Sequence, residues 1–183
     1  MVKELDKKLW EECITFHGHA CPGLAIGYAA VFAAIDKMGI PYQRAEDEEI
    51  VCVSENDACG VDSIQWLLSC TVGKGNMLFR PMGKSAFSFF ARKTGKRVRL
   101  VTDFPQEWMT LSREEMMNKI LNSPSEVVFK FKEPDFELPE EAKIFDSIRC
   151  DICGERTRED KIRLQDGKRV CLACFKDYSR TFL

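Results

Sequence analysis

Apolar residues recur at helical spacing in several stretches of the first 121 residues, and these stretches predict the helical part of the fold. Residues 3–15 carry one apolar stripe, made of Leu5, Leu9, Trp10, Cys13 and Ile14. Residues 24–38 are apolar on nearly all sides until a glycine and a proline end the pattern, so this helix should be central to the core or to a subunit interface. Further amphipathic helices are predicted for residues 61–70 and 106–121.

Short runs of apolar, β-branched and aromatic residues predict the strands. They cover residues 50–54, 77–80, 86–92, 97–101 and 126–132. The segment Lys93-Thr-Gly-Lys96 is typical of a hairpin turn between two of them. Because helices and strands do not alternate regularly, the order favours an α+β fold, with a core of mixed helices and antiparallel sheet, over a doubly wound one.

The chain of 183 residues has room for one medium core and a small appendage. A boundary between them is indicated by residues 133–147, which contain two prolines and are typical of a linker. Its acidic residues include Glu133, Asp135, Glu137, Glu140 and Glu141. We therefore predict an α+β core over residues 1–132, an acidic linker over 133–147 and a separate module over 148–183.

Composition narrows the setting in which the protein works. No apolar run approaches the ~20 residues that cross a bilayer, and the first ten residues lack the apolar stretch of a secretory signal. We therefore expect no membrane association and a cytoplasmic location. In a reducing cytoplasm, the nine cysteines should bind metal or carry out thiol chemistry rather than form structural disulfides.

Four of the cysteines lie together at the end of the chain. Cys150 and Cys153 form one C-x-x-C pair, and Cys171 and Cys174 form a second pair after seventeen intervening residues. This is the spacing of a structural zinc site, because each pair can turn two sulfurs inward and two pairs complete a tetrahedron. The cofactor we predict here is one zinc ion bound by four thiolates.

The residues around these cysteines predict a small fold. Residues 157–164 and 168–171 should form two strands turning at Asp166-Gly167, and residues 172–182 a helix. Knuckle, hairpin and helix together resemble a treble-clef zinc finger. The segment from residue 150 onward has eight basic and six acidic residues. A net charge of about +2 is weak for DNA binding, so partner contact is favoured over nucleic acid.

The chain's two histidines lie in the segment His17-x-His19-x-Cys21. If this segment is extended, side chains two residues apart share one side, so two imidazoles and a thiol can converge. All three groups bind zinc and similar divalent metals. The alternative is that these residues cap the following helix and that Cys21 is simply buried.

A second constellation surrounds Cys59, with Asp57 before it and Asp62 after it. Cys59 precedes a predicted helix start, where backbone amides and the helix dipole can lower a thiol pKa, and either aspartate can cap or ligate. A mixed site of His17, His19, Cys21 and Cys59 is therefore a candidate second divalent-metal centre. A redox role for Cys59 stays open as well, since the sequence does not show which cysteine lies near it.

Residues 74–99 hold eight lysines and arginines and no acidic residue, with phenylalanines between them. This pattern fits a site for an acidic ligand, and it fits the solvated face of a hairpin with phenylalanines packed behind it. We favour the second interpretation. The nearby Gly73-Lys74-Gly75-Asn76 lacks the Gly-x-x-x-x-Gly-Lys-Ser/Thr pattern, so nucleotide hydrolysis is not predicted.

Three ordered motifs add a resemblance. The segments Phe16-His-Gly-His-Ala-Cys-Pro-Gly-Leu-Ala-Ile-Gly27, Glu55-Asn-Asp-Ala-Cys-Gly-Val-Asp62 and Cys70-Thr-Val-Gly-Lys-Gly-Asn76 resemble the FmdE family of formylmethanofuran dehydrogenase proteins. The resemblance implies an α+β core, often an intertwined homodimer, with a metal-binding finger in some members. It places His17, His19, Cys21 and Cys59 at family motif positions.

The family takes its name from a molybdenum or tungsten enzyme, but this chain lacks iron–sulfur ferredoxin spacing and a pterin signature. We therefore expect an accessory protein, a homodimer that contacts a larger enzyme complex through its finger, rather than the redox component of that enzyme. Two alternatives stay open. One is a metal-dependent enzyme acting at the core His/Cys site, and the other is a metal- or ligand-sensing regulator that binds nucleic acid through the finger.

Overall fold

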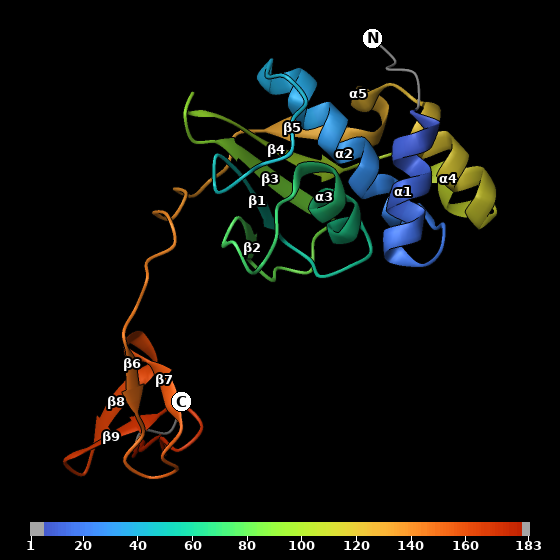
Figure 1. Cartoon of the computed structure of the whole chain (residues 1–183). Coiled ribbons are helices and arrows are strands. Elements are labelled where there is room, and N and C mark those ends of the chain that lie inside the picture. Colours follow the sequence, from blue (N-terminus) through green and yellow to red (C-terminus); the bar gives the residue numbers. More distant parts are fainter. Residues whose placement is uncertain (1–5, 181–183) are drawn as a thin grey trace. The chain divides into compact units, whose positions relative to one another are not determined.

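The computed structural model describes residues 6–180, which form two compact units that divide between residues 141 and 142 (Figure 1). The first unit is an α+β core, and the second is a small β-rich module. None of the helices in residues 6–180 is both long and apolar enough to cross a membrane.

Three helices near the start of the chain form one layer of the first unit. They are α1 (Lys7–His17), α2 (Pro22–Met38) and α3 (Gly60–Leu68). The Asp6 carboxylate accepts hydrogen bonds from the Lys8 and Leu9 amides and begins α1, and Gly18 ends it with a positive φ of 95°. The α2 helix is buried over most of its length, as its all-round apolar pattern predicts.

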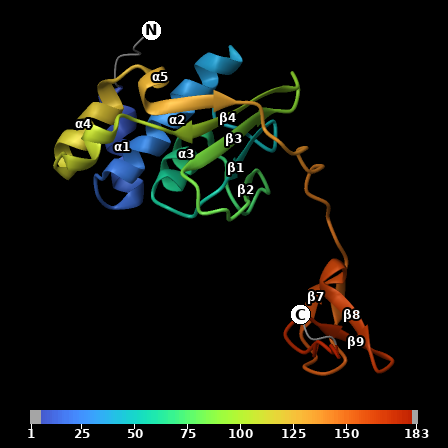
Figure 2. The same ribbon diagram turned by 180° about the vertical axis from the view of Figure 1, so that it is seen from behind.

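A five-stranded sheet packs against these helices. Its order is β2 (Met77–Phe79), β1 (Ile50–Ser54), β3 (Ala86–Ala91), β4 (Lys96–Thr102) and β5 (Phe129–Lys132). Only the β1–β2 pair is parallel; the other three are antiparallel. Seen from behind, β3 and β4 lie in front of the helices (Figure 2). The main core lies between these layers and includes Leu24, Val31, Ile64, Phe87, Phe89 and Leu100.

Residues 133–141, which the sequence analysis assigns to the linker, contact the sheet and belong to the first unit. The Phe136 ring lies 5.8 Å from Phe90 and 4.8 Å from the Arg80 guanidinium. Asp135 accepts a hydrogen bond of 2.6 Å from Arg80. Phe136 and Leu138 pack against a second apolar cluster built on Val51, Val53 and Phe90.

Two predicted elements of the first unit differ in the structure. The single helix expected over residues 106–121 is a 3₁₀ helix, η1 (Gln106–Thr110), followed by α4 (Arg113–Asn122). The reason is a capping box, in which Ser112 and Glu115 bond each other's backbone amides and begin a new helix. The strand expected over residues 126–132 starts as α5 (Ser125–Val128) and becomes β5 only from Phe129.

The second unit contains two antiparallel strand pairs. They join β6 (Ser147–Arg149) to β7 (Arg156–Arg158), and β8 (Ile162–Gln165) to β9 (Lys168–Cys171), with η2 (Glu159–Lys161) between the pairs. Asp166 and Gly167 have positive φ values of 51° and 73° and make the predicted hairpin turn.

The helix predicted for residues 172–182 is wrong for the described part of that range. Residues 172–174 form one turn, in which the Phe175 amide bonds the Cys171 carbonyl at 2.9 Å, and no helix continues to residue 180. The following side chains are largely exposed, so there is little apolar contact to stabilise a short helix. Residues 181 and 182 lie outside the described residues.

Candidate metal centres

The four C-terminal cysteines converge in the second unit. Their sulfurs all lie within 4.8 Å of one another, and the Sγ atoms of Cys153 and Cys171 are 3.9 Å apart. A tight knuckle after Cys150 makes this possible, because Gly154 adopts a φ of 75° and its amide bonds the Cys150 carbonyl. The arrangement brings together all four residues that the spacing selects.

Hydrogen bonds prepare this cluster for a cation. Backbone amides of Cys153, Cys171 and Ile152 donate to the Cys150 sulfur and lower its pKa to about 6. The hydrogen bonds of Cys174 with Cys153 and Cys171 raise its pKa to about 12. One thiolate is therefore favoured by the backbone, whereas a second negative charge is resisted by the neighbouring sulfurs. A divalent cation removes that repulsion, so the donor set fits zinc.

The second unit has very little apolar core of its own. Its buried residues in the described chain are Cys150, Val170 and Cys171, with Cys174 and Phe175 packed against them. Most of these are metal ligands. Bound zinc must therefore supply most of the folding free energy of this unit, a contribution of roughly 10–16 kcal/mol in zinc-finger peptides.

The second cluster joins His17, His19 and Cys21 in the first unit. One ligand atom from each residue lies within 4.8 Å of the others, and the two imidazole rings are 4.5 Å apart. The extended conformation considered for this segment is wrong, because His17 ends α1 and Cys21 is the N-cap of α2. The reversal at Gly18 brings the three side chains together instead.

Asp62 holds His17 in place from α3. The carboxylate Oδ2 lies 2.7 Å from His17 Nδ1, and Oδ1 accepts a hydrogen bond from the Gln65 side chain. The other ring nitrogen of His17, Nε2, faces the cluster and lies 3.9 Å from the Cys21 sulfur. Carboxylates that bond the second nitrogen of a metal-binding histidine fix the ring's tautomer and orientation. The sequence pattern predicts Asp62 only as a cap or a ligand.

Cys59 lies beside Cys21 rather than within the three-residue cluster. The sulfurs of Cys59 and Cys21 lie 3.7 and 3.9 Å from the Cβ position of Gly23. A close approach of α2 to the start of α3 brings them together, because a Cβ atom at Gly27 would lie 2.0 Å from the Gly60 carbonyl oxygen. A Cβ at Gly23 would lie 3.2 Å from the Cβ of Cys59. Glycines at this crossing are therefore required by packing.

The expectation that the helix start lowers the Cys59 pKa is wrong. Burial raises the pKa of this thiol, and the hydrogen bond and charge of Cys21 raise it further. These effects outweigh the favourable contribution of the local backbone. Asp57 is exposed, and the N-cap position of α3 is occupied by Cys59 itself, which makes no side-chain capping bond.

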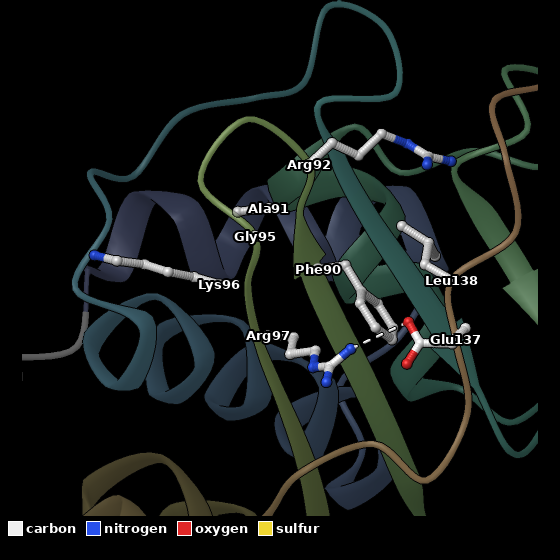
Figure 3. A pocket seen from close by; sticks show the side chains of 8 residues that line it. All are labelled: Phe90, Ala91, Arg92, Gly95, Lys96, Arg97, Glu137 and Leu138. Atoms are coloured by element: carbon white, nitrogen blue, oxygen red, sulfur yellow. Dashed lines mark hydrogen bonds and ion pairs between the residues drawn. The ribbon is translucent and has the colours of Figure 1, made fainter.

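A hollow of about 230 Å³ lies between the β3–β4 hairpin and residues 137–138 (Figure 3). Its basic side chains are already engaged. Arg92 pairs with Glu48, Lys96 donates to the Gly39 carbonyl, and Arg97 pairs with Glu137, as the dashed line in Figure 3 shows. Phe87, Phe89 and Phe90 are buried on the same hairpin. This agrees with the packed hairpin favoured from the sequence.

Comparison with known proteins decides the family. The model described as "FmdE, Molybdenum formylmethanofuran dehydrogenase operon" matches residues 16–130, which is well over half of the chain. The chain belongs to the FmdE family. The model described as "Prokaryotic dksA/traR C4-type zinc finger" matches residues 143–180 and includes all four clustered cysteines. This FmdE-family protein therefore combines an FmdE core with a four-cysteine zinc finger.

Two relatives extend this comparison. A probable S-adenosyl-L-methionine-binding protein of Archaeoglobus fulgidus is 28% identical over 191 residues, which cover 89% of this chain. The match covers 51% of that protein, so this FmdE-family chain spans about half the length of its curated relative. A crystal structure of a tungsten formylmethanofuran dehydrogenase FmdE-like protein from Syntrophus aciditrophicus is 24% identical, with a TM-score of 0.68 over 95% of this chain and 94% of that one. The second comparison shows a shared fold.

Proposed function

We propose that this FmdE-family protein is a zinc-binding accessory protein whose core carries a second divalent-metal site made by His17, His19 and Cys21. The observation that carries the proposal is the convergence of two imidazoles and a thiol, with Asp62 behind His17. Three side chains of this kind match the ligand number of catalytic and ligand-binding zinc sites, which leave one coordination position open.

The local structure supports metal binding at each of these residues. The Asp62 carboxylate lies 2.7 Å from His17 Nδ1, where it favours the tautomer that carries its proton on Nδ1 and leaves Nε2 for the metal. The Leu24 amide donates to the Cys21 sulfur at 3.3 Å, from the N-terminus of α2, where negative charge is favoured. Cys21 is 3% exposed, whereas His19 is exposed. The site is therefore closed on the side of Cys21 and open to solvent on the side of His19.

An accessory role fits the surface of the finger. The finger is small, has a weak net positive charge and exposes Ile152, Leu164 and Leu172, which suits protein contact better than a polyanion. We place the protein in the cytoplasm as a homodimer whose finger contacts a larger enzyme complex. A reducing compartment would keep the four cysteines of the finger available for zinc.

The open coordination position also favours one alternative, an enzyme that polarises a substrate at the core metal. The name of the A. fulgidus relative suggests S-adenosyl-L-methionine as the first ligand to test. Calorimetric binding of this compound to the zinc-loaded protein, and its loss in His19→Ala, would favour the enzyme over the accessory protein.

Metal stoichiometry of the purified full chain tests the main proposal. We expect two ions per chain in the wild type and one in His17→Ala or His19→Ala. Cys59→Ser is the matched control and should keep two, because Cys59 lies outside the ligand cluster. One ion in the wild type and in each of these variants would refute the core site and leave the finger as the sole metal centre.

A further inference from the structure

We propose that Cys21 and Cys59 are a redox pair whose oxidation to a disulfide withdraws the Cys21 thiolate from the core metal and releases that metal. This inference rests on the proposed metal site at His17, His19 and Cys21. It assigns a role to Cys59, which lies beside the ligand cluster without belonging to it.

The fold places the two sulfurs next to one glycine, Gly23. A Cβ atom at Gly23 would lie 3.7 Å from the Cys59 sulfur and 3.9 Å from the Cys21 sulfur. Both sulfurs therefore lie next to the same position of α2, where its start approaches the start of α3. The tight contact of Gly27 with Gly60 holds the N-terminal part of α2 against the start of α3, and the two cysteines are the N-cap residues of these helices.

Exposure distinguishes this pair from the other core cysteines. Cys13, Cys52 and Cys70 are fully buried, so an oxidant in solution cannot reach them without opening the core. Cys59 is half-buried and accessible, whereas Cys21 is 3% exposed. Cys59 is therefore the cysteine that reacts with the oxidant, and Cys21 is the resolving cysteine that attacks the mixed disulfide.

The chemistry requires a disulfide oxidant, for which oxidised glutathione is a sufficient example. The Cys59 sulfur attacks one sulfur of the oxidant, forms a mixed disulfide and expels a first glutathione thiolate, while the Cys59 proton passes to solvent. The Cys21 thiolate then attacks the Cys59 sulfur and expels a second glutathione thiolate. Two electrons pass from the cysteines to the oxidant, which leaves as two reduced thiols.

The consequence for the metal follows from the loss of one ligand. A disulfide sulfur is a poor ligand, so the oxidised site keeps only His17 and His19. The thiolate charge that balanced the cation is also lost. Because Cys59 is not a ligand in the reduced protein, it can react first while the metal is still bound. The site is thereby arranged to hold metal under reducing conditions and release it under oxidising ones.

The test uses the full-length, zinc-loaded protein treated with oxidised glutathione. Free zinc is followed with a chromogenic chelator, and the thiols are alkylated before unreduced peptide mapping by mass spectrometry. We expect a peptide cross-linked through Cys21 and Cys59 and release of the core ion in the wild type. Cys59→Ser should release only what the finger loses, and the same finger loss in both proteins serves as the internal control.

The outcomes separate this inference from the proposal on which it rests. If the untreated wild type holds one ion per chain, the core metal site is refuted, and release fails with it. If it holds two ions but no Cys21–Cys59 peptide forms, the redox pair alone is refuted. Equal release from the wild type and Cys59→Ser would also refute it, as would a disulfide that forms while both ions stay bound.

Discussion

The zinc site of the finger and the proposed metal site of the core have opposite relations to the structure around them. In the finger, most of the buried side chains are themselves the cysteine ligands, so the fold of the finger depends on its zinc site. In the core, His17, His19 and Cys21 lie at the edge of a large apolar core that includes Leu24, Ile64 and Phe89. Zinc therefore supplies the stability of the finger, whereas the first unit folds through its apolar core and positions its candidate ligands without metal.

The largest effect should come from removing one finger ligand. Cys153→Ser should unfold the second unit, because zinc supplies most of its stability, on the order of 10 kcal/mol. Hydrogen exchange should show lost protection over residues 147–171 and unchanged protection in the first unit. Cys59→Ser is the matched control, with normal protection in both units. A protected finger in Cys153→Ser would break the comparison.

The core should respond instead to loss of a buried ion pair. The Glu55 carboxylate is 2% exposed and bonds Arg99 at 2.5 and 2.9 Å. Glu55→Ala leaves Arg99 buried without a partner and should destabilise the first unit by about 3–5 kcal/mol in urea unfolding. The control is Glu133→Ala, which breaks an exposed pair with Arg97 and should cost less than about 1 kcal/mol. Equal effects would contradict this ranking.

The same pair gives a pH dependence. The hydrogen bond from Arg99 lowers the Glu55 pKa below its usual value in the folded protein. A carboxyl with a lowered folded pKa stabilises the protein fully above its unfolded pKa of about 4.3 and loses that stabilisation as the pH falls through the folded value. The stability difference between the wild type and Glu55→Gln should therefore narrow in acid, and a constant difference would contradict the assignment.

A smaller change in stability is expected at Gly27, where α2 approaches α3 and positions Cys59. Helix propensity alone predicts that Gly27→Ala stabilises the protein by about 1 kcal/mol. The added Cβ would lie 2.0 Å from the Gly60 carbonyl oxygen, so we expect destabilisation of about 1–3 kcal/mol instead. Gly73→Ala has nothing within 4 Å of its Cβ position and should be nearly neutral. A stabilised Gly27→Ala would show that the two helices separate easily.

The smallest structural effect should accompany Asp62→Asn. This variant weakens the group that orients His17 while leaving the core packing intact, so core metal affinity should fall about 10–100-fold with little change in unfolding. Competition with a chelator measures the affinity, and Asp57→Asn, at an exposed position, is the control. Unchanged affinity in Asp62→Asn would mean that His17 needs no orienting partner.

The sequence predicted the secondary structure well where the signal was local. The strand at Ile50–Ser54, the α2 helix and the β3–β4 hairpin follow the predicted ranges closely, because their periodicity and turn residues act within a few positions. It failed where one residue redirected the chain, as at Ser112, or where tertiary contact was needed, as in residues 172–180. The expected position of the linker also changed, because Phe136 finds an apolar partner on the sheet.

The sequence by itself determined the family motifs, the order of most elements and the four finger cysteines, because each depends on spacing along the chain. Tertiary structure decided that Asp62 meets His17 across 45 residues, and that Cys59 faces Cys21 rather than joining its cluster. Those contacts depend on how closely α2 approaches α3 at Gly27 and Gly60. Such a distance is set by the packing of whole helices, and no local pattern encodes it.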